Sequence, residues 1–235
     1  MKLIKLNSRS VFYCLICLWM PTFISSCSEE EPEVSVKLSC VDGKHGHAVD
    51  LGLSVNWACC NVGANTPEEF GGYYAWGETK EKSKYDGYTY KWNYNDHNDI
   101  TKYCTDSVFG RVDNKTILDS EDDVAHVKWG GNWRMPSHEE MNELIDKCSW
   151  KWTTYNGIEG YIVTGPNTNS IFLPAAAFIR GEEKWAKILV GQYNTASLDT
   201  DEPISNICLM FSSGFITTDS DNRIYGCSVR PVCDK

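Results

Sequence analysis

Three consecutive carboxylates, Glu121, Asp122 and Asp123, form a concentrated group of potential metal ligands in this 235-residue chain. Carboxylate oxygens are the ligands that Ca²⁺ prefers, so calcium binding is one interpretation of the run. The alternative is structural, because acidic side chains at the start of a helix are stabilised by the positive end of its dipole. The position of the run favours the structural interpretation. We therefore predict no cofactor and no metal site, with calcium left open as the alternative.

The other candidate motifs for catalysis or metal binding are incomplete. His138-Glu139 begins like a metalloprotease helix, but residue 142 is Asn, where the second histidine ligand would be required. His45 and His47 have a spacing that fits no standard zinc pattern, and a polar turn accounts for them better. The sequence contains no nucleophile elbow, P-loop or dinucleotide fingerprint. These observations predict a non-catalytic protein, although 32 acidic residues leave paired carboxylates for glycoside hydrolysis open.

Two short helices joined by a tight Gly-Gly corner are predicted to position the acidic run. Ser120 is expected to cap the first helix, directly before the carboxylates. Ser137 and Glu140 have the spacing of a capping box for the second helix. Met141 and Leu144 recur at helical spacing and give this second helix an apolar face. The tryptophans on either side of the corner, at positions 129 and 133, are expected in the core.

Short antiparallel strands are predicted for much of the remaining chain, which indicates a mixed α+β fold. The long segment 77–119 is polar and aromatic without a sustained period, and we expect a loop packed by its own Tyr and Trp side chains. The predicted strand segments are 34–38, 48–58 with a break at Gly52, 71–76, 161–163, 171–173, 204–211, 215–217 and 225–232, with turns at 42–46, 165–169, 212–214 and 219–222.

The N-terminal segment has the pattern of an export signal. Three basic residues precede an apolar stretch at 11–20 that is too short to span a bilayer as a helix. Ile24-Ser-Ser-Cys27 then resembles the lipobox of bacterial lipoproteins, which implies lipidation of Cys27 and a stable membrane anchor. The acidic residues 29–31 resemble the export tag of surface lipoproteins in Bacteroides-type bacteria. We expect a signal peptide at 1–26, an acidic tether at 27–46, and an exported outer-membrane lipoprotein exposed at the cell surface.

The net charge indicates which partners are expected, and the cysteine content indicates whether disulfides are possible. The chain has a net charge of −10, and its signal segment contains three basic residues but no acidic ones, so nucleic acid is not an expected partner. Eight cysteines remain outside the signal and the lipidation site, an even number that allows disulfides in an exported protein. Their pairing is left open; they are Cys40, Cys59, Cys60, Cys104, Cys148, Cys208, Cys227 and Cys233.

Several motifs in combination resemble one family over residues 47–233. The motifs are Val49-Asp-Leu-Gly-Leu-Ser-Val-Asn-Trp57, Gly71-Gly-Tyr-Tyr-Ala-Trp-Gly-Glu78, Trp129-Gly-Gly-Asn-Trp-Arg-Met-Pro136, Ser170-Ile-Phe-Leu-Pro-Ala-Ala176 and Ser228-Val-Arg-Pro-Val232. They resemble the Fibrobacter succinogenes major paralogous domain, which is found in surface lipoproteins of gut Bacteroidetes. The resemblance implies a C-type-lectin-like fold for residues 47–235, shared with formylglycine-generating enzymes and with the variable proteins of diversity-generating retroelements.

The chain departs from the functional motifs of these relatives. Asp201-Glu-Pro-Ile204 has Ile where calcium-dependent lectins place an amide or carboxylate ligand, so their calcium and sugar site is not expected. Cys227 and Cys233 lie within the terminal strand rather than before it, which weakens an oxidase interpretation. The retroelement relatives bind ligands through surface positions in the C-terminal portion. The resemblance to these relatives implies that the C-terminal portion of this chain also has a ligand-binding surface.

The leading hypothesis is a surface-anchored binding or adhesion module that recognises an extracellular glycan or protein. Amphipathic aromatics and short polar side chains suit such recognition at low entropic cost. Two alternatives are kept: an envelope enzyme, either oxidase-like or a carbohydrate-active hydrolase, and a structural component of a surface assembly. The predicted ligand-binding residues are Tyr193, Asn194, Ser197, Asp199, Asn206, Arg223 and Tyr225.

Overall fold

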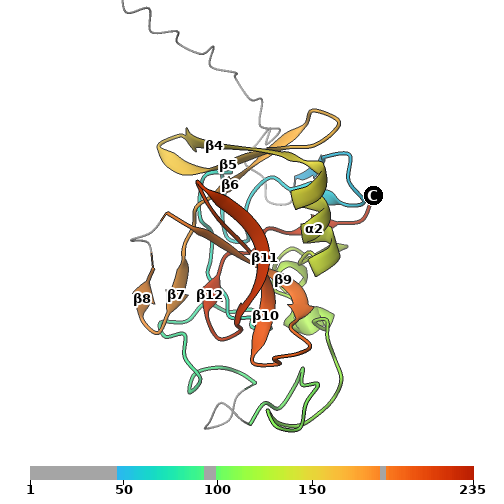
Figure 1. Ribbon diagram of the computed structural model, residues 1–235, viewed down its shortest axis with the longest axis vertical. Helices are drawn as coiled ribbons and strands as arrows, with labels where there is room; N and C mark the ends of the chain where they lie inside the picture. Colours follow the sequence, from blue (N-terminus) through green and yellow to red (C-terminus); the bar gives the residue numbers. More distant parts are fainter. Residues whose placement is uncertain (1–46, 93–98, 186–188) are drawn as a thin grey trace, which may run out of the picture. The chain divides into compact units, whose positions relative to one another are not determined.

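The computed structural model describes residues 47–92, 99–185 and 189–235 (Figure 1). All of these residues belong to one compact unit, Val36–Lys235, which is separate from Met1–Ser35. The predictions for the signal peptide, for Cys27 and Cys40, and for the elements at 34–38 and 42–46 lie outside the described residues. No helix in the described ranges is long and apolar enough to cross a membrane.

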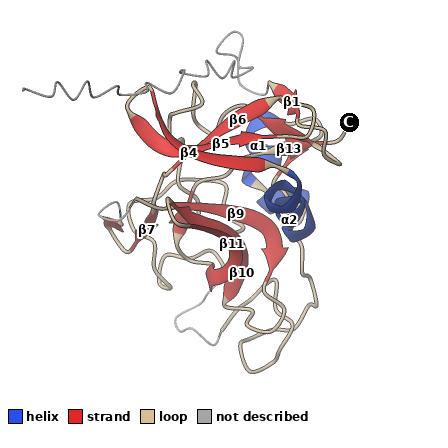
Figure 2. Cartoon of the chain, turned by 45° about the horizontal axis from the view of Figure 1, so that its top comes forward, coloured by secondary structure: helices blue, strands red, loops and turns tan. Residues whose placement is uncertain are grey.

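Antiparallel sheets dominate the described chain, and only two α-helices accompany them, so the fold is mixed α+β with little helix (Figure 2). The helical elements are the 3₁₀ turn η1 (Ser120–Asp122), α1 (Val124–Trp129) and α2 (His138–Lys147). The strands are β1 (Ala48–Asp50), β2 (Asn56–Ala58), β3 (Trp133–Arg134), β4 (Ser149–Tyr155), β5 (Ile158–Thr164), β6 (Ser170–Pro174), β7 (Phe178–Arg180), β8 (Glu183–Lys184), β9 (Gly191–Leu198), β10 (Ser205–Ser212), β11 (Phe215–Asn222), β12 (Gly226–Cys227) and β13 (Val232–Cys233).

One four-stranded sheet joins the two ends of the described chain. Its order is β1-β2-β13-β3, and β13 pairs antiparallel with both β2 and β3. Val232 lies opposite Trp57 on one side and Arg134 on the other. Gly52 has a φ of 77° in the connection between β1 and β2, which confirms the predicted break. The last strand therefore holds the helical region against the start of the domain.

The other strands form three sheets of three strands each, in the orders β4-β5-β6, β11-β10-β9 and β12-β7-β8. The predicted hairpin around residues 165–169 is confirmed as β5 and β6. The β10–β11 hairpin is also confirmed, and α2 packs beside the β11-β10-β9 sheet (Figures 1 and 2). The structure also contains strand β9, which the sequence analysis did not predict.

Three expectations for local structure are wrong. Residues 219–222 do not form a turn but continue β11, since Asp219 pairs with Cys208 across the hairpin. Segment 71–76 is not a regular strand among the described residues, and only Tyr74 forms an isolated bridge, to Cys227. In both cases tertiary pairing, which local turn and strand propensities do not report, decides the backbone conformation.

The cap of the first helix is a third correction. Ser120 begins the 3₁₀ turn instead, and the N-cap of α1 is Asp123, whose carboxylate accepts hydrogen bonds from the backbone N–H groups of Ala125 and His126. The second helix behaves as predicted: Ser137 and Glu140 form a complete capping box, and Met141 and Leu144 are buried.

The core consists of several clusters that use aromatic side chains throughout. The largest contains Trp57, Tyr193 and Phe211 together with the buried face of α2. The polar segment 77–119 contributes Tyr85, Tyr90 and Tyr103, all buried. Their hydroxyl groups donate to the backbone or to a carboxylate, as buried hydroxyls require. The described part of this segment is thus packed by its own aromatic side chains, as the sequence predicts.

Candidate functional site

Five of the seven predicted ligand-binding residues are buried, so they do not form an exposed ligand face. The exposed-face interpretation is therefore wrong for them: three lie on β9, whose residues are all buried, one lies on β10, and one follows β11. The five buried residues are Tyr193, Asn194, Ser197, Asn206 and Arg223.

Arg223 is held inside the protein by backbone carbonyl groups. Its guanidinium donates to the carbonyl oxygens of Tyr103 and Pro203 at 2.8 Å each and of Lys102 at 3.0 Å. It also lies 5.6 Å from the ring centroid of Trp76. These contacts join segment 77–119 to the C-terminal part of the chain. Arg223 is therefore a fixed internal cross-link with no surface left for a ligand.

The buried polar residues of β9 and β10 satisfy one another. Asn194 Nδ2 donates to the Tyr74 carbonyl at 3.0 Å, and its Oδ1 accepts from Asn206 Nδ2 at 3.1 Å. The Tyr193 hydroxyl donates to the Pro174 carbonyl at 2.7 Å. The Ser197 hydroxyl accepts from the backbone N–H of His138 at 3.0 Å, at the start of α2. Buried polar side chains need such partners, and here they connect separate elements.

The two remaining predicted residues are half-buried. Asp199 accepts backbone hydrogen bonds from Asp201 and Glu202 and so closes a local turn. Tyr225 stacks on Phe178 with ring centroids 5.8 Å apart. Asp199 lies at one end of β9 and Tyr225 beside β12, so the structure does not bring the predicted set together at one surface.

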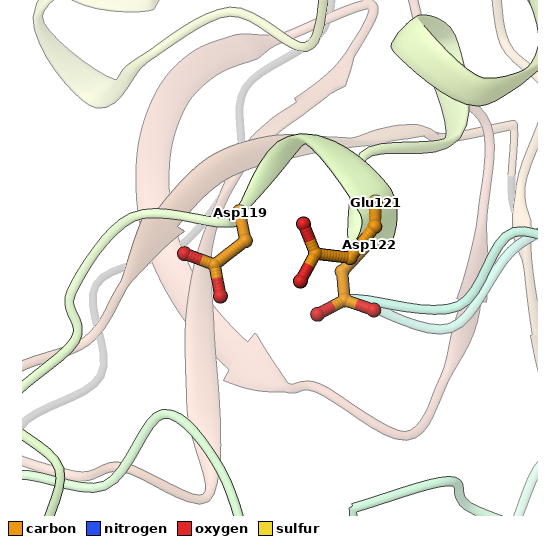
Figure 3. A group of neighbouring side chains, drawn as sticks. All are labelled: Asp119, Glu121 and Asp122. Atoms are coloured by element: carbon orange, nitrogen blue, oxygen red, sulfur yellow. The ribbon is translucent and has the colours of Figure 1, made fainter.

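The carboxylates of Asp119, Glu121 and Asp122 lie close together at η1, within 4.8 Å of one another (Figure 3). Lysine ammonium groups occupy the positions that a cation would take. Lys102 Nζ lies 2.6 Å from both Asp119 and Asp122, and Lys91 Nζ lies 2.7 Å from Asp122. Although burial opposes it, hydrogen bonds from Lys102 and Lys91 hold the pKa of Asp122 below its usual value. The cluster is an ion-pair network at the base of the helix.

Asp123, the third residue of the acidic run, is also used structurally. One carboxylate oxygen caps α1, and the other accepts from the backbone N–H of Met135 at 2.8 Å. This single side chain therefore joins the start of α1 to the segment that follows β3. A buried carboxylate whose two oxygens already accept three backbone N–H bonds is accounted for by the fold, which supports the structural interpretation of the run.

A cleft with a volume of about 710 Å³ lies beside this joint. Segment 116–120, helix α1, strand β3 and the first turn of α2 form its walls. Its lining combines apolar and polar groups; they include Ile117, Ser120, His126, Asn132, Trp133, Glu139 and Asp234. We refer to this feature as the helical cleft.

A half-buried tryptophan is the largest side chain in the helical cleft. Trp133 packs edge-on against Trp129, with ring centroids 5.1 Å apart and an interplanar angle of 87°. Both rings are half-buried and belong to no core cluster of the described chain, so the expectation that they are core residues is wrong. Gly130 and Gly131 between them have positive φ values of 70° and 59°. The Gly-Gly corner therefore folds the two tryptophans against each other.

Some polar side chains around Trp133 already form ion pairs, whereas others form no hydrogen bond with the described residues. Arg134 forms a bidentate ion pair with Glu140, with nitrogen–oxygen distances of 2.8 and 2.6 Å. In contrast, the side chains of His126 and Asn132 make no hydrogen bond to any other described residue, and Asn132 is exposed. The helical cleft thus has a rigid floor and hydrogen-bonding groups that are open to a ligand.

A smaller hollow of about 300 Å³ adjoins the helical cleft and shares Thr116, Ile117 and Glu139 with it. Ser197 and Asp199 line this hollow. These are the only two of the predicted residues that line either hollow. The side chain of Ile117 is 49% exposed at the shared boundary. Together the two hollows form one continuous lined surface along segment 116–120.

Burial disfavours the reactive form of several cysteine thiols in the described ranges. Cys59 is disulfide-bonded. Burial raises the pKa of Cys148 to about 11 and also raises the pKa of Cys104 and Cys233. A raised thiol pKa disfavours the thiolate, which is the reactive form in nucleophilic and redox chemistry.

Comparison with protein-family models, curated proteins and solved structures finds no match to this chain. Sequence reasoning missed the helical cleft because the tryptophans of the corner looked like core residues. The available signal was the spacing Trp129-Gly-Gly-Asn-Trp133, in which two glycines separate two large rings and expose a polar residue between them.

Proposed function

We propose that this protein is an exported, surface-anchored and non-catalytic binding module that recognises an extracellular glycan in the helical cleft. The observation that carries the proposal is the half-buried Trp133 beside the unengaged side chains of Asn132 and His126. The scaffold we propose is C-type-lectin-like. The α+β architecture and the pairing of the last strand with β2 support that assignment.

A glycan suits this lining better than a purely apolar or an ionic ligand. Sugar rings present apolar C–H faces that pack on aromatic rings, together with hydroxyl groups that require hydrogen-bond partners. Trp133 offers the ring, and Asn132 offers both a donor and an acceptor. The exposed Glu139 adds an acceptor at the mouth.

The non-catalytic part of the proposal rests on the carboxylates of the helical cleft. Asp123 accepts three backbone N–H bonds, Glu140 is held by Arg134 and by the capping box, and Asp234 lies 3.2 Å from Arg134, which leaves Glu139 as the remaining carboxylate of this lining, with no ion pair among the described residues. Glycoside hydrolysis requires two carboxyl groups that are free to exchange a proton or attack the sugar. Engaged carboxylates are poor candidates for either role.

Surface anchoring rests on the sequence of the N-terminal segment. The lipobox-like Ile24-Ser-Ser-Cys27 and the acidic residues after it support attachment to the outer membrane through lipid on Cys27. Labelling of cells with a radioactive or clickable fatty acid tests the lipidation. We expect label on the wild-type protein and none on Cys27→Ser, and equal labelling of both would contradict the anchor.

A glycan array with the purified protein tests the ligand site. We expect binding to one class of glycan, and at least about tenfold weaker binding for Trp133→Ala, since a packed tryptophan contributes strongly to a contact surface. Asn132→Ala should weaken binding in the same direction. Tyr88→Ala, which changes an exposed aromatic residue outside the helical cleft, is the matched control. Cleavage of a bound glycan, or binding unchanged in Trp133→Ala, would contradict the proposal.

A further inference from the structure

Three aromatic side chains form a row across the small β12-β7-β8 sheet. The ring of Phe178 lies 6.0 Å from that of Trp185, with an interplanar angle of 9°. It lies 5.8 Å from the ring of Tyr225, with an angle of 27°. The three rings are therefore nearly parallel. We refer to them as the aromatic row.

The aromatic row has a covered end and an open end: Tyr225 packs against the buried cluster that contains Tyr85, whereas Trp185 at the other end is exposed. Successive side chains of a strand point to opposite faces, so Phe178 and Arg180 share one face and Ile179 the other. Ile179 packs against the buried cluster that contains Tyr85. Trp185 is 42% exposed, whereas Phe178 and Tyr225 are half-buried. A surface of ring atoms is thus open to solvent.

The sheet beneath the aromatic row is held in place from the core side. Gly181, in the turn between β7 and β8, exchanges two backbone hydrogen bonds with Tyr85, at 2.7 and 2.9 Å. Lys184 Nζ lies 4.3 Å from the ring centroid of Phe70. Trp185 itself is bound by its backbone N–H to the Phe178 carbonyl at 2.8 Å. Binding on such a supported surface loses little conformational freedom.

Charged groups of both signs surround the aromatic row. Arg180 lies 5.6 Å from the ring centroid of Tyr225. Arg180, Glu182 and Glu183 are exposed, and none of them forms an ion pair with a residue in the described ranges. A border with one cation and two carboxylates complements neither a polyanion nor a polycation. It does offer donors and acceptors to hydroxyl groups.

From this geometry we infer that the aromatic row is a second carbohydrate-binding surface, which takes a neutral polysaccharide chain. Because the rings stack on one another, the open surface is mainly that of Trp185; it suits the apolar face of a sugar unit, and the mixed border suits its hydroxyl groups. The inference uses none of the residues of the helical cleft. It therefore stands whether or not the helical cleft binds a glycan.

A protein partner fits the aromatic row less well. A stable protein interface buries about 800 Å² on each partner. Three aromatic side chains contribute about 150–250 Å² each when fully buried, and two of these three are already half-buried. The ring surface that remains is too small to form the centre of such an interface. It is sufficient for a sugar ring.

Affinity electrophoresis of the full-length protein in native gels tests the inference. The probes are the neutral polysaccharides hydroxyethyl cellulose, arabinoxylan and galactomannan, with polygalacturonate as the acidic comparison. We expect retardation by at least one neutral polysaccharide and a dissociation constant at least about tenfold weaker for Trp185→Ala. Trp185→Phe should retain part of the retardation. Tyr88→Ala, which changes an exposed aromatic residue outside both sites, should be retarded like the wild type.

The outcomes distinguish a failure of the second surface from a failure of the helical cleft. Loss of retardation in Trp133→Ala but not in Trp185→Ala would overturn the second surface and leave the helical cleft supported. Retardation by polygalacturonate alone, or by no polysaccharide, would also overturn it. An unchanged near-ultraviolet circular dichroism spectrum and melting temperature for Trp185→Ala would show that its effect is local. If that variant is unfolded, Arg180→Ala replaces it, and unaltered retardation of a folded Arg180→Ala would count against the inference.

Discussion

Two fully buried arginines use their guanidinium groups to connect distant backbone segments. Arg230 donates to the carbonyl oxygens of Ala58, Cys59 and Phe172 and to the side chain of Asn61. Arg223 donates to three backbone carbonyls. Burial lowers the pKa of Arg230. At the residue scale these side chains explain how loop-rich segments become fixed: carbonyls without strand partners are satisfied by charged donors.

Removal of Arg223 should therefore destabilise the protein rather than its ligand complex. We expect Arg223→Ala to lower the free energy of unfolding by about 3 kcal/mol or more, because three carbonyl acceptors lose their donor in a buried site. Urea unfolding followed by tryptophan fluorescence measures this change. The exposed Arg180→Ala is the control and should change it by less than about 0.5 kcal/mol. A stable Arg223→Ala that no longer binds a glycan would restore Arg223 as a ligand contact.

The ion pairs of Asp119 and Asp122 with lysines lead to a second prediction at the residue scale. Addition of millimolar Ca²⁺ should leave the melting temperature unchanged, because Lys91 and Lys102 already neutralise Asp119 and Asp122. A ligand that binds the folded state raises the apparent stability in proportion to its affinity. Differential scanning fluorimetry in Ca²⁺ and in a chelator measures the effect. A calcium-dependent increase of several degrees would show that a cation displaces the lysines.

At the scale of elements, one carboxylate replaces the cap that the sequence suggested for α1. Asp123 caps the helix and also binds the backbone N–H of Met135. The 3₁₀ turn at Ser120 advances the chain by three residues before the α-helix begins. The walls of the helical cleft depend on this joint, because they come from both sides of it.

Alanine variants of Asp123 and Ser120 test which of these two residues caps α1. Asp123→Ala should cost about 2 kcal/mol of stability, since it removes the helix cap and a third backbone hydrogen bond. Ser120→Ala should cost less than about 0.5 kcal/mol, because Ser120 is exposed and does not cap α1. Thermal and urea unfolding of the two variants side by side provide the measurement. Equal costs would mean that Ser120 has a capping role after all.

The ion-pair network at η1 predicts how stability depends on pH. Hydrogen bonds from Lys102 and Lys115 hold the pKa of Asp119 below its usual value, and Asp122 is shifted in the same direction. A carboxyl group with a lower pKa in the folded state stabilises that state above its unfolded pKa, near 4, and loses this contribution as the pH falls further. Urea unfolding between pH 2.5 and pH 7 should show the loss. Asp122→Asn should flatten the profile below about pH 4, and an unchanged profile would exclude the network as its source.

At the scale of the whole molecule, the last strand closes the fold. β13 pairs with β2 and with β3, so the C-terminal segment holds the helical region against the first strands. Contacts between distant parts of the sequence also come from Arg223, Arg230 and the Asn194–Asn206 pair. Such a topology is completed only when the C-terminus is in place.

Disruption of this closing strand should prevent folding. Val232 is fully buried between Trp57 and Arg134, so Val232→Asp places a charge in the core without a partner. We expect loss of the near-ultraviolet circular dichroism signal and of the cooperative unfolding transition. Asp234→Ala, two residues further and exposed, should fold normally. A cooperative transition in Val232→Asp would show that the domain closes without β13.

The sequence by itself determined those elements whose signals are local. The capping box of α2, the β5–β6 hairpin and the break at Gly52 depend on neighbouring residues, and all three are confirmed. The polar, aromatic character of segment 77–119 also predicted its irregular backbone. These features follow from short-range hydrogen bonds and backbone preferences, which a single sequence contains in full.

Only the tertiary structure decided which polar and aromatic residues face solvent. Asn194, Asn206 and Arg223 have the composition of a binding surface, yet neighbouring elements cover them and satisfy their hydrogen bonds. Trp133 is a residue type that usually lies in the core, yet the Gly-Gly corner leaves it in the lining of a cleft. Burial depends on what packs against a side chain from distant segments. That information arises only when the whole chain has folded.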